Sequence, residues 1–345
     1  MAKAKKLKSG HWRVQVFSHY EIIDGKKMKR QRSFTAPTKA QAEMMAAKFA
    51  SDKERYANGT LTVGEAVDKY IADKEAVLSP STVRAYLGMR KRLGLIECIR
   101  VDALTAADLQ HWVSIQAAQI SPKSVKNAYA LVTAAVSIYV DKVFRVTLPA
   151  RKPLQYDVPT DAGVEALMAE ARDDLKIAIA LAAIGTLRRG EICALKYKDV
   201  LRDFKAVYVH SDMVLNKDNV WVHKEMPKTA DSVRRIPLPD EVMGLLGEGD
   251  PDEYIVKRSP TAITDAFRRL RDKLGLKCRF HDLRHYAASI LHAIGVPDQY
   301  IMERGGWSTD GTLKAVYRNT LSDKSLEYQG KANDYFSAKL FKKEG

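Results

Sequence analysis

TLRRGEICAL at residues 186–195 is the first of four separated segments that decide the fold and the chemistry of this chain. The other three are PKTADSVRRIPL at 227–238, FHDLRHYAAS at 280–289 and GGWSTDGTLKAVYRN at 305–319. Together they supply arginine, lysine, histidine, tryptophan and tyrosine side chains, without an acidic cage for a metal ion. This inventory favours a site that binds one phosphate group and attacks it with a single oxygen nucleophile.

The arginines of these segments match the needs of phosphate chemistry. Attack on a phosphodiester builds negative charge, which a metal ion or guanidinium groups can stabilise, and the guanidinium fork fits phosphate oxygens bidentately. Arg188 and Arg284 are therefore the predicted phosphate ligands. Lys228 is the candidate acid for the leaving 5′ oxygen, because burial beside two arginines would lower its pKa towards neutrality.

The remaining polar groups complete the predicted reaction. The rings of His281 and Trp307 can donate hydrogen bonds to the same phosphate, and Tyr317 can supply the attacking phenolic oxygen. A covalent tyrosyl link would conserve the energy of the broken bond for rejoining, so neither ATP nor another cofactor is required.

Each of these residues also has an ordinary structural interpretation. Arg188 and Glu191 have the i,i+3 spacing of a common helix-surface pair. His281 and His285 have the i,i+4 spacing of a zinc helix, but Asp282 replaces the expected glutamate and no third ligand is evident. Four motifs in one order are far more specific than any single residue, and they favour the phosphate site.

Charge predicts a polyanionic partner for this chain. The sequence has 345 residues, enough for two or three domains, with 46% hydrophobic residues and a net charge of +15. Residues 1–57 hold 14 Lys/Arg and 5 Asp/Glu, which gives 14 − 5 = +9. Nucleic acid or an anionic membrane surface would suit such a surplus.

The sequence favours a soluble cytoplasmic protein over a secreted or membrane protein. Its three cysteines are far apart and show no metal or redox spacing. No stretch approaches the roughly 20 apolar residues of a membrane span, and no apolar run follows the basic N-terminus.

The first 57 residues predict a small β-sheet with one helix. Trp12, Val14 and Val16 alternate with polar residues, Asp24-Gly25 is a hairpin turn signal, and the pattern turns helical over 38–56. A solvated basic tail is the alternative. The sheet interpretation predicts DNA contacts from Arg13, Lys27, Lys29, Arg30 and Arg32.

Residues 60–150 predict a bundle of four helices. Ser79-Pro80 and Ser121-Pro122 are helix starts, and Thr105 with Asp108 resembles a capping box. Apolar stripes follow each start at helical spacing. The predicted DNA-binding cations of this bundle are Arg84, Arg90, Lys91, Lys123 and Lys126.

After a linker at 149–158, the rest of the chain predicts helices around a small antiparallel sheet. A helical pattern runs over 160–185, and the strand-rich interval 204–238 contains KAVYVH, NVWVHK and SVRRIPL. A helix begins at Ser259-Pro260 and reaches about Leu274, and helical patterns continue from His281. The predicted class is an α+β multidomain protein.

The four segments resemble the signatures of tyrosine recombinases, the integrase family of phages and conjugative elements. The resemblance implies an arm-type DNA-binding domain at 1–57, a helical core-binding domain at 60–150 and a mainly α catalytic domain at 158–345. It also implies that Glu191 orients the first arginine and that Lys228 lies on a β-hairpin. The implied catalytic residues are Arg188, Lys228, His281, Arg284, Trp307 and the nucleophile Tyr317.

The implied activity is site-specific recombination through a 3′-phosphotyrosine intermediate that integrates or excises a mobile element. The implied partners are double-stranded DNA with core and arm sites, a homo-tetramer on DNA, and an excisionase or host DNA-bending protein. Thr186 and Gly306 depart from the usual family residues without removing a functional group. Two alternatives stay open: an inactive DNA-binding relative and a type IB topoisomerase.

Overall fold

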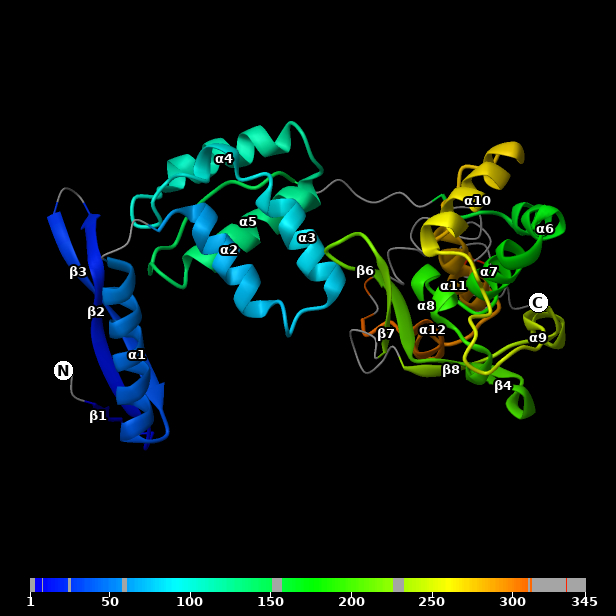
Figure 1. Cartoon of the computed structure of the whole chain (residues 1–345), viewed down its shortest axis with the longest axis horizontal. Helices are drawn as coiled ribbons and strands as arrows, with labels where there is room; N and C mark the ends of the chain where they lie inside the picture. The colour runs from blue at the N-terminus through cyan, green and yellow to red at the C-terminus, as the bar shows by residue number, and fades with distance from the viewer. Residues whose placement is uncertain are drawn as a thin grey trace, which may run out of the picture. The chain divides into compact units, whose positions relative to one another are not determined.

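A computed structural model describes residues 4–7, 9–23, 26–57, 61–150, 157–225, 233–309, 311 and 333. The chain divides into two compact units, residues 1–152 and 153–345 (Figure 1). The first unit contains a sheet with one helix and a group of helices, and the second contains the segments with the predicted catalytic residues.

The N-terminal sheet has three antiparallel strands in the order β1 (Lys5–Lys6), β2 (Trp12–Ile23) and β3 (Lys26–Ala36). Helix α1 (Lys39–Ala57) packs on it (Figure 1). Val14 lies opposite Phe34 and is fully buried, so the predicted alternation places one face of β2 in a small core. The sheet-plus-helix prediction is confirmed, while the turn at 24–25 lies outside the described residues.

Four α-helices follow, as predicted: α2 (Val63–Lys74), α3 (Pro80–Arg90), α4 (Ala106–Ala117) and α5 (Pro122–Val136). The hydroxyls of Ser79, Thr105 and Ser121 each accept a backbone N–H three residues on, which is the N-cap bond that their sequence motifs predict. The apolar stripes meet in one core around Trp112, whose side chain is fully buried.

The second unit is mainly helical. Its helices are α6 (Asp161–Glu170), α7 (Asp173–Ala183), α8 (Arg189–Ala194), α9 (Asp240–Leu246), α10 (Pro260–Lys273), α11 (Asp282–Ala293) and α12 (Asp298–Gly305). The single helical pattern predicted over 160–185 is two helices, because Ala171 and Arg172 adopt extended backbone angles between them. Helix α7 is buried along most of its length and forms the centre of the core.

Two small antiparallel sheets complete this unit. One has the order β4 (Val200–Leu201), β5 (Ala206–Val209) and β8 (Arg234–Pro237), and the other pairs β6 (Ser211–Leu215) with β7 (Trp221–Glu225). The three strands predicted over 204–238 are present, but β6 was not predicted. Its sequence SDMVL begins with two polar residues and lacks a clear alternation. In the described part of the chain, no helix is both long and apolar enough to cross a membrane.

Candidate active site

The candidate site is built around the start of α8, where Arg188 is the N-cap residue. Glu191, only 2% exposed, accepts the backbone N–H of Arg188 at 2.8 Å and its guanidinium Nη1 at 2.6 Å. The i,i+3 spacing therefore makes a capping carboxylate in the interior and not the surface pair of the alternative interpretation. The side chain of Arg188 remains 34% exposed, so it is partly accessible from outside.

A second arginine holds the same carboxylate. Arg234 of β8 donates from Nη1 and Nη2 to the two oxygens of Glu191 at 3.2 and 2.9 Å. Burial alone would raise the pKa of Glu191, but the charge of Arg234 and its hydrogen bonds, with the charge of Arg188, hold that pKa below its usual value. Glu191 is thus an ionised buried carboxylate with a positive group on each side.

The C-terminal end of α12 binds these arginines through its carbonyl groups. The oxygen of Arg304 accepts from Arg234 Nε at 2.8 Å, and that of Gly306 accepts from Arg188 Nη2 at 2.8 Å. The oxygen between them, that of Gly305, accepts from Nη2 of Arg284. The last carbonyls of a helix have no partner within the helix and lie at the negative end of its dipole, so they suit cationic donors.

Arg284 of α11 is the most enclosed of these groups. Its side chain is fully buried, and its guanidinium carbon lies 4.0 Å from the ring centroid of Trp307. It also donates to the carbonyl of Thr186, while its Nε has no hydrogen-bond partner among the described residues. In this conformation Trp307 covers the arginine that was predicted to bind phosphate.

The departures from the family pattern at 186 and 306 have a structural role. Thr186 has a φ of +60°, in the left-handed region that is unusual for a β-branched residue. Its hydroxyl donates to the carbonyl of Arg304 at 2.9 Å, which ties the start of the site to the end of α12. Gly306, with a φ of +61°, is the left-handed C-cap that ends α12 before Trp307.

The two histidines of the third segment pack together at the start of α11. The rings of His281 and His285 meet edge to face with centroids 5.0 Å apart. Desolvation and, for His281, the charge of Arg284 lower the pKa of each to about 4. With this lowered pKa, His281 is a neutral hydrogen-bonding group near pH 7. Within the described residues, no three His, Cys, Asp or Glu side chains gather as metal ligands.

Sequence reasoning missed two charged residues of this site. Arg234 stands in a quoted segment, but only its inward position on β8 shows that it reaches Glu191. Asp212 of β6 packs against Gly190, and burial with the charge of Glu191 raises its pKa to about 6. Neither is visible from spacing, because each contact depends on how the strands pack against α8.

Arg189, the residue after Arg188, also packs within the fold and is not a surface residue. Its side chain is half-buried, donates to the hydroxyl of Thr264, and lies 5.8 Å from the ring centroid of Trp221. It therefore joins α8 to α10 and β7. Lys228 and Tyr317 lie outside the described residues, so their assignments remain predictions.

The predicted DNA-binding cations of the first unit are mostly accessible. Arg13, Arg84, Lys91 and Lys123 are exposed and Lys126 is half-buried. The side chains predicted on the second half of the sheet lie outside the described ones: Lys27, Lys29, Arg30 and Arg32.

Arg90 requires a correction, because it is not a free surface cation. Its guanidinium binds Asp68 at 2.7 and 2.9 Å and Glu97 at 2.8 Å, and its side chain is 19% exposed. These bonds join α3 to α2 and to the segment that follows α3. The spacing of α3 predicted an outward position, but the two carboxylates that bind this arginine come from other segments.

Comparison with known proteins identifies the class. Residues 160–323 match the phage integrase family. The integrase of Mycobacterium phage D29 is 22% identical over 331 residues, which are 86% of this chain and 87% of that protein. The second unit is therefore a phage integrase family domain, and the chain carries the catalytic fold of a tyrosine recombinase. The resemblance drawn from the four segments is confirmed.

Solved structures show the same fold. The integrase of the transposon Tn1549, in complex with transposon right end DNA, gives a TM-score of 0.62 at 18% identity, covering 74% of this chain and 95% of that one. A lambda integrase tetramer bound to a Holliday junction gives 0.56 at 16% identity, covering 91% of this chain and 94% of that one.

The packing of Trp307 leads to a prediction about Gly305. A Cβ at this position would lie 2.2 Å from the indole ring, so Gly305→Ala must displace Trp307 from Arg284. We expect a loss of about 1–3 kcal/mol in the free energy of unfolding, measured by urea denaturation, as for other overpacked sites. Gly244→Ala in α9 meets no atom within 4 Å and should not destabilise the chain. Equal stability of the two variants would contradict this packing.

The lowered pKa of His285 predicts a pH dependence of stability. The imidazole is neutral in the fold down to about pH 4, whereas in the unfolded chain it gains a proton near pH 6.5. Stability from this group is therefore fully present above pH 6.5 and is lost as the pH falls towards 4, by about 3 kcal/mol. His285→Gln should flatten this part of the unfolding profile, and His111→Gln on the surface of α4 should not. An unchanged profile in His285→Gln would exclude His285 as the cause.

Proposed function

We propose that this chain is a site-specific DNA recombinase that cleaves and rejoins DNA through a 3′-phosphotyrosine intermediate. One observation carries the proposal: Arg188, Arg284 and Trp307 come from three separated segments and converge on the end of α12. Glu191 and the neutral His281 complete the set in the described residues. Such a cluster provides preorganised positive charge and hydrogen-bond donors for a phosphate undergoing substitution.

The proposed reaction assigns one task to each group. Tyr317 attacks the scissile phosphorus, and the bond from phosphorus to the 5′ oxygen breaks. Lys228 gives the leaving oxygen its proton, and the freed hydroxyl later attacks the phosphotyrosine of a partner strand. Arg188, which is partly accessible, meets the phosphate first.

Arg284 needs a rearrangement before it can touch a phosphate directly. The guanidinium is fully buried beneath the indole of Trp307. Movement of Trp307 from the arginine face to the phosphate would uncover the cation and also bring the indole N–H to the phosphate. The unpartnered Nε of Arg284 is then available as a donor.

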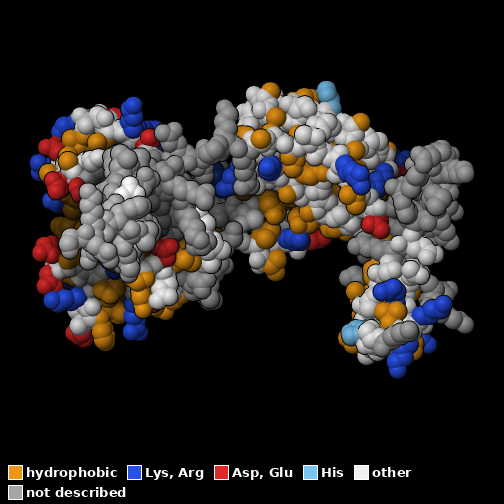
Figure 2. Space-filling view, turned by 180° about the vertical axis from the view of Figure 1, so that it is seen from behind, with side chains coloured by type: hydrophobic (Ala, Val, Ile, Leu, Met, Phe, Trp, Pro, Cys, Tyr) orange, Lys and Arg blue, Asp and Glu red, His pale blue; other side chains and the backbone are white. Residues whose placement is uncertain are grey.

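The rest of the chain is assigned to DNA binding. We assign residues 1–57 to arm sites, residues 60–150 to the core site and residues 158–345 to catalysis, within a homo-tetramer that acts in the cytoplasm. The excess charge of residues 1–57 supports the arm assignment, and Figure 2 shows lysine and arginine side chains on the small N-terminal sheet. An excisionase or a host DNA-bending protein would set the direction of a mobile element's recombination.

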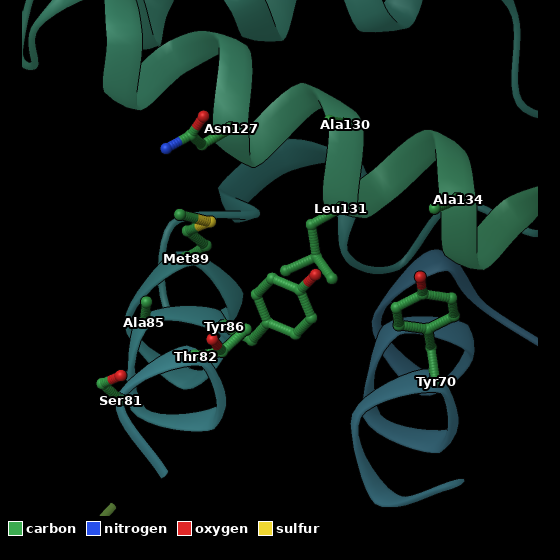
Figure 3. A pocket seen from close by; sticks show the side chains of 10 residues that line it. All are labelled: Tyr70, Ser81, Thr82, Ala85, Tyr86, Met89, Asn127, Ala130, Leu131 and Ala134. Atoms are coloured by element: carbon green, nitrogen blue, oxygen red, sulfur yellow. The ribbon is translucent and has the colours of Figure 1, made fainter. Parts of the chain in front are cut away.

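An open pocket of the helical group suits the reading of DNA bases. It has a volume of about 470 Å³ and lies between α3, α5 and α2 (Figure 3). Asn127 and Ser81 are exposed polar groups at its wall, while Ala85 and Ala130 are small apolar ones. Asparagine pairs with adenine edges and small apolar groups contact thymine methyls in the major groove. We assign Lys123, which is exposed on α5 four residues before Asn127, to the phosphate backbone.

The covalent step gives the most direct test of the function. A duplex nicked next to the cleavage site should trap the protein as a covalent adduct, and Tyr317→Phe should form none. Arg188→Ala should bind the same DNA but lower the rate of adduct formation by about 10²–10³-fold or more, because transition-state charge stabilisation is lost. Adduct from Tyr317→Phe would remove the assigned nucleophile.

The same substrate separates the alternatives. No adduct from the wild-type chain on its own attachment DNA would favour an inactive DNA-binding relative. Adduct followed only by rejoining within one duplex would favour a topoisomerase, whereas joining between two duplexes is expected of a recombinase.

The pocket predicts two different effects on DNA binding. Asn127→Ala should reduce the free energy of binding to the preferred core sequence by about 1–3 kcal/mol. It should have little effect on binding to sequences that are changed at the base it reads. Lys123→Ala should weaken binding to all sequences alike. It should also lower the slope of the logarithm of the binding constant against the logarithm of the salt concentration by about one. Ser114→Ala, exposed on α4, is the control. Equal effects of Asn127→Ala on all sequences would exclude base reading.

A further inference from the structure

We propose that Arg234 is a positioning residue for DNA cleavage, which holds the Glu191 carboxylate and the end of α12 where both can fix Arg188. The inference rests on the proposed function and adds a residue to its site. Arg234 binds the Glu191 carboxylate and the Arg304 carbonyl, and we propose that it acts on Arg188 through these two groups.

Its contacts converge on the group that orients Arg188. Nη1 and Nη2 of Arg234 reach the two oxygens of Glu191 at 3.2 and 2.9 Å, and both side chains are almost completely buried, at 4% and 2% exposed. The same two oxygens accept from the guanidinium and the backbone N–H of Arg188. A rotation of the carboxylate away from Arg234 would therefore break its bonds to Arg188 as well.

The Nε group of Arg234 binds the C-terminal end of α12, which also binds Arg188. Its Nε donates to the carbonyl of Arg304 at 2.8 Å, two residues before the Gly306 carbonyl that accepts from Arg188. One planar guanidinium thus holds both the carboxylate and the helix end. The lysine ammonium is a single point charge on a flexible stem and cannot reproduce this three-donor geometry.

Charge explains why the carboxylate needs this second arginine. Glu191 is buried, and burial disfavours its ionised form unless positive groups offset it. Arg234 supplies the largest favourable charge and hydrogen bonding that hold the pKa of Glu191 below its usual value. With a weaker partner the pKa should rise, so Glu191 would be protonated and release Arg188 at a pH where the native site is still intact.

The neighbouring residue provides a matched control. Alternation along β8 turns Arg234 inward and Arg235 outward, where its guanidinium lies 6.0 Å from the ring centroid of Phe204. Arg235→Gln therefore removes the same charge from the same strand without touching Glu191. A loss seen in both variants would reflect total charge or strand stability and not the position of Arg188.

The experiment follows adduct formation on the nicked duplex from pH 5.5 to 8.5 for the wild type, Arg234→Lys, Arg234→Gln and Arg235→Gln. We expect adduct formation by Arg234→Lys to fall progressively below the wild-type rate as the pH decreases from 8.5 to 5.5 and to recover towards wild type at high pH, because the pKa of Glu191 rises when its main partner is weakened. Arg235→Gln should stay within about twofold of wild type throughout. DNA binding and the circular dichroism spectrum confirm that each variant is folded.

A second comparison keeps the proposal testable if Arg234→Gln fails to fold. In the Glu191→Gln background the carboxylate that Arg234 binds is absent, while Asp212, whose pKa is raised to about 6, still titrates beside the site. Arg234→Lys should therefore no longer move the acidic limb of the pH–rate profile and should cost less than in the wild type. The positioning role would be overturned if Arg234→Lys left the acidic limb of the pH–rate profile unmoved in the chain that retains Glu191. Equal losses in the rate of adduct formation in both backgrounds would overturn it as well. The absence of adduct from the wild type would instead refute the proposed function.

Discussion

The site depends on one buried carboxylate shared by two guanidinium groups. Glu191 accepts hydrogen bonds from the side chains of Arg188 and Arg234 and from the backbone at the start of α8. An unpaired buried charge costs several kcal/mol, so this carboxylate stabilises the fold only while both partners remain. The requirement fixes α8 against β8, and it keeps Arg188 in one orientation before any DNA arrives, as preorganised catalysis requires.

The end of α12 extends this constraint to the remaining segments. Successive carbonyls at 304, 305 and 306 accept from Arg234, Arg284 and Arg188. Trp307 follows directly in the chain and stacks on Arg284, and the segment to the predicted nucleophile Tyr317 begins there. In the proposed reaction, a phosphate bound by these arginines would lie close to the point where the segment to Tyr317 begins.

Local signals of the sequence predicted much of the fold. The N-caps at Thr105 and Ser121 and the alternation around Val14 depend on neighbouring residues only, and all three are confirmed. The partners of Arg90 and Arg234 could not be predicted, because each lies on a segment distant in sequence that only folding brings near. Motif order predicted the family, but it did not indicate that Trp307 covers Arg284.

The most direct test is the measured geometry of the site on DNA. A crystal structure of the Tyr317→Phe variant on an intact core site would give the distances from one scissile phosphate to Arg188, Arg284 and Trp307. We predict guanidinium nitrogens about 2.7–2.9 Å from its oxygens, the indole moved off Arg284, and Glu191 still bound to both Arg188 and Arg234. A scissile phosphate bound elsewhere, with Arg284 still covered and Glu191 released from Arg188, would contradict the account.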